Sequence, residues 1–183
     1  MAAYMRDQFP FLGVPTPARR RAVRGLFPRT LDRELIDALW SLPEREFQYV
    51  ACDHLQKVPL ESAAADFLRS LVVRKSWWDT VDALAKPVGR ACTPEQMRAW
   101  ARDDNLWVRR AAVLHQLGRR EATDAELLGE ILAGNVDSGE FFLDKAVGWA
   151  LREYSKTDPA WVRTFLDEHE MAALTRRGGS KYL

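Results

Sequence analysis

Apolar side chains recur along the chain at intervals of three and four residues, the spacing of one face of an α-helix. Phe47, Val50 and Ala51 open one such stretch, and Trp107 and Ala111 open another. Neither Asn-Gly nor Asp-Gly, the usual signals of a tight β-hairpin, occurs in the sequence. The pattern predicts an all-α chain of about ten or eleven helices of ordinary length.

Expected helix starts consist of a capping residue followed by proline or by an acid in the first turn. These signals are Thr16-Pro17, Ser41 to Glu44, Thr93-Pro94, Thr123-Asp124 and Asp158-Pro159. Ser76 is a further expected cap, at the start of the helix that carries Asp79. The sequence therefore predicts short helices joined by tight turns.

An internal repeat accompanies these helices: an aromatic residue is followed four positions later by a small one. The pairs are Phe47 and Ala51, Trp107 and Ala111, and Phe142 and Ala146, while Trp78 begins a fourth copy. In chain order the copies start 31, 29 and 35 residues apart, about the length of one helical hairpin. We interpret residues 1–183 as a single domain, a superhelical solenoid of HEAT-like antiparallel helix pairs with a concave face.

Charge is unevenly distributed, although the formal net charge is only +1. Residues 1–30 carry +5, residues 31–70 carry −4, residues 71–120 carry +5 and residues 121–183 carry −5. Two arginine clusters stand out: Arg19, Arg20, Arg21 and Arg24, and then Arg109, Arg110, Arg119 and Arg120. If folding brings them together, they form one basic face suited to a polyanion. The alternative is that they lie on separate solvated helix faces.

Several function classes find no support. A composition of 47% hydrophobic and 29% charged residues excludes disorder as the main state. Neither the two cysteines nor the three histidines have the spacing of metal ligands, so we expect no metal and no disulfide scaffold. The sequence contains no Gly-rich phosphate loop, dinucleotide fingerprint or nucleophile elbow, so we expect no nucleotide cofactor. Without a long apolar run or a signal region, the protein is expected to be cytoplasmic and to have no membrane partner.

Asp82 interrupts the repeat, because it stands where the other copies have alanine. A carboxylate inside a helix stack costs several kcal/mol unless it is hydrogen-bonded, ion-paired or open to a cleft. One interpretation is structural: the register is shifted by a turn, or Asp82 pairs with an arginine such as Arg110. The other is functional: Asp82 is an electrostatic or general-base carboxylate in a groove.

Large aromatic and cationic residues are expected near Asp82. Trp77, Trp78 and Trp149 offer flat faces that attract cations or stack on bases, although core packing is the better explanation of any single tryptophan. Arg110 and Arg152 bring guanidinium groups to the same region if the helices align, and guanidinium suits phosphate.

The sequence resembles a known family, the AlkD-type alkylpurine DNA glycosylases, or DNA alkylation repair enzymes. The resemblance covers nearly the whole chain. Its most specific strings are Trp-Trp-Asp-x-Val-Asp at residues 77–82 and Gly-Trp-x-Leu-Arg-Glu-Tyr at residues 148–154. Further matching stretches are 4–13 with Thr16-Pro17, 46–51, 107–112 and 140–147.

The resemblance implies a right-handed superhelix of HEAT-like helix pairs whose concave, basic face holds duplex DNA. Asp82 resembles the catalytic aspartate, and Trp78 and Trp149 resemble the aromatic residues that flank the sugar and backbone at the lesion. Arg110 is similar to the arginine near the DNA backbone. The residues similar to those that contact or brace the bound strand are Arg152, Tyr4, Thr16 and Arg20.

The reaction implied by the resemblance is hydrolysis of the N-glycosidic bond of an N3- or N7-alkylated purine in double-stranded DNA. Such a base already carries positive charge and leaves without a general acid, so the protein need only stabilise the oxocarbenium sugar and place water. No cofactor is implied. We expect a monomer that is associated with the nucleoid when bound to DNA.

The sequence also departs from the family. The family usually has a further N-terminal helix before the Tyr4 segment, and this helix is expected to be missing. Gly178 and Gly179 are expected to break a helix that the family continues. Two other functions stay open: a non-catalytic helical-repeat DNA-binding protein of the same fold, and a protein-binding adaptor with an exposed apolar ridge.

Overall fold

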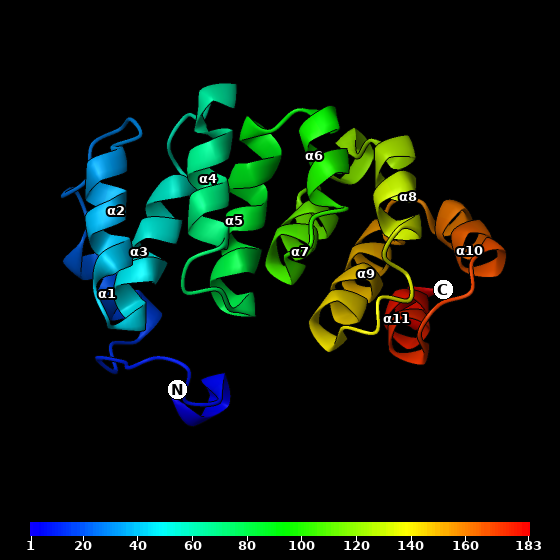
Figure 1. Ribbon diagram of the computed structural model, residues 1–183, viewed down its shortest axis with the longest axis horizontal. Coiled ribbons are helices and arrows are strands. Elements are labelled where there is room, and N and C mark those ends of the chain that lie inside the picture. The colour runs from blue at the N-terminus through cyan, green and yellow to red at the C-terminus, as the bar shows by residue number, and fades with distance from the viewer. The chain divides into compact units, whose positions relative to one another are not determined.

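The computed structural model describes residues 1–183 and contains eleven α-helices, four 3₁₀ helices and no strand (Figure 1). The α-helices are α1 (Thr16–Ala22), α2 (Arg33–Ser41), α3 (Arg45–Leu55), α4 (Ala65–Val72), α5 (Trp78–Ala91), α6 (Pro94–Trp100), α7 (Leu106–Leu114), α8 (Ala125–Ala133), α9 (Phe141–Tyr154), α10 (Pro159–Glu168) and α11 (Ala173–Gly179). The 3₁₀ helices are η1 (Ala3–Met5), η2 (Ser62–Ala64), η3 (Arg120–Ala122) and η4 (Ser180–Tyr182). The all-α prediction is confirmed. No helix combines the length and the apolar character needed to cross a membrane.

Side-chain caps start several of these helices where the sequence predicted them. Thr93 and Gln96 form a full capping box on α6: the Thr93 Oγ1 accepts from the Gln96 N–H at 3.3 Å, and the Gln96 Oε1 accepts from the Thr93 N–H at 2.9 Å. Asp158 accepts from the Trp161 N–H at 2.9 Å and caps α10. Each cap satisfies N–H groups that have no partner within the helix.

Four predicted caps are wrong. Thr16 is the first residue of α1 itself and forms no side-chain cap. The hydroxyl of Ser76 donates to a carbonyl of the preceding helix α4 at 2.6 Å, and that of Ser41 donates to a carbonyl of α2 at 2.8 Å. Both serines thus close the end of one helix instead of starting the next. On α8 the cap is Asp124, whose carboxylate accepts from a backbone N–H at 3.0 Å, and not its neighbour Thr123. Asp ranks above Thr as an N-cap.

The contacts divide the chain into two compact units, Met1–Leu60 and Glu61–Leu183. In the first unit α1 and α2 both pack against α3. Arg45, at the start of α3, is fully buried, and its guanidinium lies 3.8 Å from the centre of the Phe9 ring. Its backbone N–H donates to the Pro10 carbonyl at 2.9 Å. The segment before α1 is therefore fixed to the first turn of α3.

Glu46 anchors the same segment more strongly. Its buried carboxylate accepts the backbone N–H groups of Leu12, Gly13 and Val14 at 3.0, 2.9 and 3.2 Å. Three consecutive N–H groups converge on one carboxylate because Gly13 has a φ of 77°, in the left-handed region that glycine adopts without strain. Within the stretch 4–13 that resembles the family, Leu12 and Gly13 therefore serve to attach this segment to α3.

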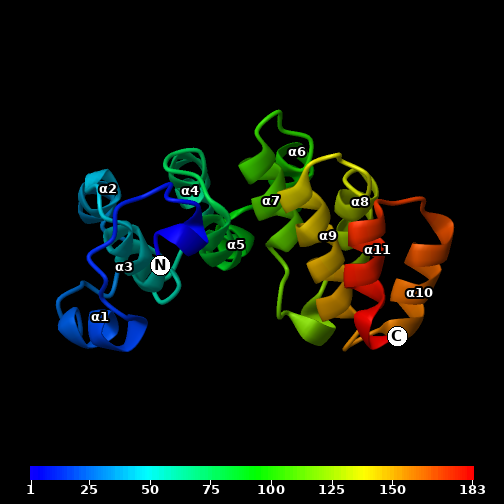
Figure 2. The same cartoon turned by 90° about the horizontal axis from the view of Figure 1, so that it is seen from below.

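In the second unit α7 lies between α5 and α9, and α4, α6 and α8 also pack on it (Figures 1 and 2). The repeat of aromatic and small residues falls on α3, α5, α7 and α9, and Ala51, Ala111 and Ala146 are all fully buried. The small residue of these three copies is therefore a core residue of its helix.

Helix α11 packs along α9, as Figure 2 shows. The α-helix ends at Gly179, where the sequence predicted a break, although both Gly178 and Gly179 still belong to α11. A Cβ placed on Gly148 of α9 would lie 2.9 Å from the Thr175 carbonyl oxygen and 3.3 Å from the Cα of Gly178. The glycines therefore allow the two helix backbones to approach closely, which outweighs their poor helix propensity.

Substitution of Gly89 tests the close contact between α5 and α7. A Cβ at Gly89 would overlap the carbonyl oxygen of His115, a backbone atom that has little room to move. We expect Gly89→Ala to lower the free energy of unfolding by about 1–3 kcal/mol, measured by urea denaturation. The control is Gly134→Ala, where the nearest atoms lie at 3.8 and 3.9 Å. A control as unstable as Gly89→Ala would contradict the steric argument.

His115 makes the stability depend on pH. It is 4% exposed, and burial lowers its pKa from 6.5 to about 4. Below pH 6.5 the His115 imidazole is protonated in the unfolded chain but stays neutral in the folded protein. The free energy of unfolding therefore falls as the pH drops towards 4. At about 1.4 kcal/mol per pH unit, the loss is about 3 kcal/mol. Urea denaturation between pH 7 and pH 4 measures it, and His115→Gln should remove most of the slope; an unchanged slope would assign it to other groups.

Candidate functional site

Asp82 and Arg110 form the central contact of the candidate site. Asp82 lies in the second turn of α5 and Arg110 in the middle of α7, and their side chains are 15% and 6% exposed. The Arg110 Nε and Nη2 donate to the two carboxylate oxygens at 2.7 and 2.8 Å. The structure confirms the interpretation that Asp82 pairs with Arg110. The pairing leaves a functional role open, since each oxygen has a further lone pair.

Arg110 has a third partner, because its Nη1 donates to the backbone carbonyl of Phe142 in the first turn of α9. One guanidinium therefore joins α5, α7 and α9. The planar, forked donor set of arginine suits this arrangement, in which two parallel bonds go to a carboxylate and a third bond points elsewhere.

The pKa of Asp82 results from two opposing effects. Burial raises the pKa of the carboxyl above its ordinary value, and the charge of Asp79 one turn away acts in the same direction. The hydrogen bonds and the positive charge of Arg110 lower it. Burial prevails, so the charged form of Asp82 depends on the guanidinium beside it.

An aromatic cluster, formed by Trp77, Trp107 and Phe142, lies against the first turns of the same helices. The ring centres are 5.7 Å apart for Trp77 and Trp107, 5.0 Å for Trp77 and Phe142, and 5.3 Å for Trp107 and Phe142. The ring of Trp77 packs inside this cluster, so the core-packing alternative holds for this tryptophan. The cluster holds the start of α9, which supplies the carbonyl bound by Arg110.

The other predicted residues of the second unit lie on α5 and α9. Trp78 is the first residue of α5, one turn before Asp82, and is half-buried. Trp149 and Arg152 lie one turn apart on α9 and are also partly accessible. Neither Trp149 nor Arg152 forms a hydrogen bond or an ion pair with Asp82. Arg152 forms no ion pair with an acidic residue.

The remaining predicted residues, Tyr4, Thr16 and Arg20, belong to the first unit. Tyr4 is 73% exposed in η1, and Thr16 is an exposed residue at the start of α1. Arg20 donates to both oxygens of Asp53, with its Nη2 at 2.7 Å from Oδ1. All three are accessible to a ligand, although the charge of Arg20 is partly neutralised.

The two predicted arginine clusters fall in different units and are less available than the sequence implies. In the second cluster Arg110 is buried in its ion pair, and the Nη2 of Arg119 donates to the carbonyl of Gly89. In the first, Arg19 shares the carboxylate of Asp53 with Arg20. Four of the eight arginines thus have protein partners, so counting charges overestimates the basic surface.

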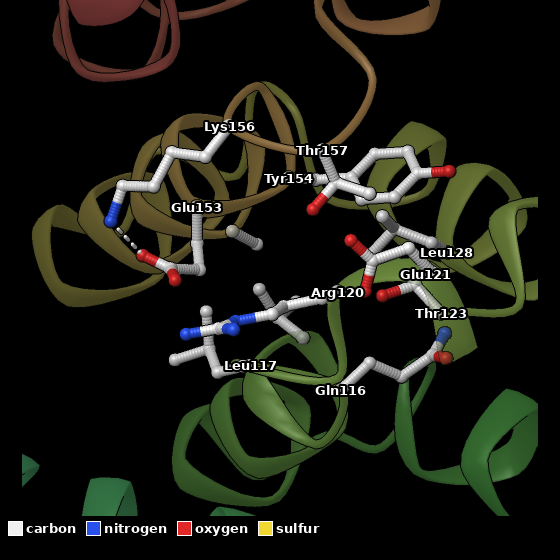
Figure 3. A pocket seen from close by; sticks show the side chains of 13 residues that line it. Gln116, Leu117, Arg120, Glu121, Thr123, Leu128, Glu153, Tyr154, Lys156 and Thr157 are labelled. Atoms are coloured by element: carbon white, nitrogen blue, oxygen red, sulfur yellow. Dashed lines mark hydrogen bonds and ion pairs between the residues drawn. The ribbon is translucent and has the colours of Figure 1, made fainter.

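A polar cavity of about 350 Å³ opens between the C-terminal ends of α7 and α9 (Figure 3). Glu153 and Lys156 form an ion pair of 2.5 Å at its edge, and Arg120 and Glu121 face it from η3. None of the residues predicted for the site lines this cavity. No group of three or more acidic, histidine or cysteine side chains is placed to hold a metal ion.

The fold and site define an all-α protein of successive packed helices in which a buried carboxylate is held by arginine on the neighbouring helix. Residues 1–183 match the family described as DNA alkylation repair enzyme. A solved structure described as a predicted DNA alkylation repair enzyme from Enterococcus faecalis is similar, with a TM-score of 0.90 and 35% sequence identity, over 100% of this chain and 92% of that chain. No curated protein matches. The chain belongs to the DNA alkylation repair enzyme family.

Two interactions were missed from sequence, one at the site and one in the first unit. The Phe142 carbonyl is a backbone atom and carries no sequence signal of its own. Glu46 binds a loop more than thirty residues away, and its place in the stretch 46–51 that resembles the family did not indicate this role. Both interactions join distant parts of the chain.

Replacement of Arg110 by methionine tests the balance that sets the pKa of Asp82. Arg110→Met removes the charge and the hydrogen bonds while burial persists, so the pKa of Asp82 should rise further. A ¹³C NMR titration of the Asp82 carboxyl carbon measures it. Arg109→Met is the matched control, since Arg109 forms no ion pair with Asp82. Equal shifts in both variants would contradict the direct coupling.

Proposed function

We propose that the protein is an AlkD-type monofunctional DNA glycosylase that hydrolyses the N-glycosidic bond of cationic N3- or N7-alkylated purines in duplex DNA. The observation that carries this proposal is the Asp82 carboxylate, held in place by Arg110 at the one repeat position where other copies have a buried alanine. Membership of a DNA alkylation repair family gives this carboxylate a substrate class.

In the proposed reaction the bond between C1′ and the purine nitrogen breaks, and its electron pair neutralises the positively charged base. The sugar becomes an oxocarbenium ion, which the negative charge of Asp82 stabilises. Water then attacks C1′ and loses a proton to Asp82 or to solvent, leaving an abasic site and the free base. No general acid is needed because the alkylated base is already cationic.

Arg110 acts in this mechanism as a positioning residue. Its two parallel hydrogen bonds fix the plane of the carboxylate, and its charge opposes the effect of burial, which favours the protonated acid. Only the ionised carboxylate can stabilise a cation. We therefore propose that the main role of Arg110 is to orient Asp82 and to keep it ionised. Contact of Arg110 with the DNA backbone would be secondary.

Other residues serve the DNA in this proposal. Trp78, one turn from Asp82, and Trp149 on α9 would present aromatic faces to the sugar and the cationic base. Arg152, which has no acidic partner, would bind phosphate. From the first unit, Tyr4, Thr16 and Arg20 would contact or brace the strand.

The proposal extends to the arrangement and setting of the protein. The helix pairs would form a HEAT-like solenoid whose basic concave face holds the duplex. The protein would act as a cofactor-free hydrolase in base excision repair, as a cytoplasmic monomer that associates with the nucleoid when bound to DNA.

A second candidate function is non-catalytic DNA binding by the same fold. The observation that favours it is that both oxygens of Asp82 already accept hydrogen bonds from Arg110, as in an ion pair that serves only stability. Under this alternative, alkylated DNA would be bound and no base released.

Release of methylated bases separates the two functions. Methylated duplex DNA is incubated with wild type, Asp82→Asn and the control Asp79→Asn, and free 7-methylguanine and 3-methyladenine are quantified. We expect release by wild type and Asp79→Asn, and a loss of about 100-fold or more in Asp82→Asn, because a neutral amide does not stabilise the cationic sugar. DNA binding should persist in all three. Release by none of them, with binding intact, would favour the non-catalytic alternative.

A further inference from the structure

A second cavity, of about 640 Å³, lies entirely within the first unit. It is formed by the end of α1, the connection from α1 to α2, and the last turn of α3. It contains neither Asp82 nor any other residue of the proposed excision site except Arg20. Its volume lies in the range of ligand pockets, roughly 300–1,000 Å³.

The lining of this cavity is strongly cationic. Arg20, Arg24, Arg29 and Lys57 face it, and Asp53 is its one acidic residue. The carboxylate of Asp53 is already bound by two guanidinium groups, that of Arg19 at 2.9 Å and that of Arg20 at 2.7 Å. No negative charge in the lining therefore remains to compensate the other cations.

Arg24, Arg29 and Lys57 are the available cations. All three are exposed and none forms an ion pair with an acidic side chain. Like charges that share a small volume repel one another, and this repulsion falls when an anion binds between them. The grouping of three uncompensated cations at one cavity, in a chain whose formal net charge is only +1, points to an anionic ligand.

The rest of the wall is apolar and aromatic. Phe27 packs on the buried ring of His54, with ring centres 5.0 Å apart, and Val50 and Val58 lie beside them. The Nε2 of His54 has no hydrogen-bond partner in the protein. An apolar floor beneath guanidinium groups suits a ligand with a phosphate on an organic body better than it suits a small hydrated anion.

We infer that this cavity is a phosphate-binding site in which Arg24, Arg29 and Lys57 bind the phosphate group and the wall around Phe27 packs against the attached organic part. The site is separate from the chemistry proposed at Asp82, and its existence does not depend on excision. Two sources supply this chemistry: the backbone of nucleic acid, and a free nucleoside monophosphate.

The test compares two double variants that remove the same charge. Arg24→Gln with Arg29→Gln alters the cavity, and Arg21→Gln with Arg33→Gln removes two exposed arginines of the first unit that do not line it. Circular dichroism checks that both fold. The probes are adenosine monophosphate, measured by calorimetry at low salt, and an undamaged short duplex, measured at several salt concentrations. The ring signals of His54, observed by NMR, report whether either probe binds near the cavity.

For a free nucleotide we expect saturable binding that shifts the His54 signals and weakens at least tenfold in the cavity variant only. For backbone phosphate, we expect the slope of log K against log salt concentration to become smaller by about 2 in the cavity variant, because each lost phosphate contact removes about 0.9. The slope should change less in the control. Either result supports the site and identifies the source. Equal behaviour of the two double variants with both probes overturns the inference. Base release is measured in parallel, so a failure of the proposed excision is recognised independently.

Discussion

The second unit depends on one guanidinium in an environment with little water. Arg110 is 6% exposed and bonds to the Asp82 carboxylate on α5 and to the Phe142 carbonyl on α9, while its own backbone belongs to α7. A buried charge that makes three well-directed hydrogen bonds is tolerated, whereas the same charge with its ion-pair partner removed is strongly destabilising. The relative positions of the three helices are therefore tied to the geometry of one side chain. The aromatic cluster of Trp77, Trp107 and Phe142 supports this geometry by fixing the start of α9.

A buried ion pair is a poor means of stabilising a helix stack. Apolar residues of similar volume often do as well or better, and α3, α7 and α9 use a buried alanine at the equivalent position. Under the proposed function, the pair of Asp82 and Arg110 at this position would serve chemistry and not packing. Burial raises the pKa of the Asp82 carboxyl, and the charge and hydrogen bonds of Arg110 oppose this effect. In its ionised form Asp82 would be a rigid anion in a poorly hydrated surrounding, which is what stabilisation of a developing cation requires.

The sequence predicted those features that are local or periodic. Helical spacing and the repeat of aromatic and small residues located α3, α5, α7 and α9, and the exception to that repeat located Asp82. Sequence could suggest Arg110 as the partner but could not choose it, since the two are twenty-eight positions apart. The contributions of Phe142 and Glu46 depend on backbone groups, which carry no residue-specific signal. The contact of Gly178 and Gly179 with α9 was not predicted, because helix propensity says nothing of the helix against which a residue packs.

Under the proposed function, the arrangement of charge would let a chain of net charge +1 bind a polyanion at a few defined points. Arg19, Arg20, Arg110 and Arg119 all bond within the protein and contribute order more than field. Among the cations without an acidic partner, three lie at the cavity of the first unit, and Arg152 lies one turn from Trp149 on α9. Weak overall attraction with a few localised contacts would make non-specific binding modest and sensitive to salt. Under the proposed function, discrimination would then depend less on tight capture of DNA than on the positive charge of the damaged base, which alone makes the base a good leaving group.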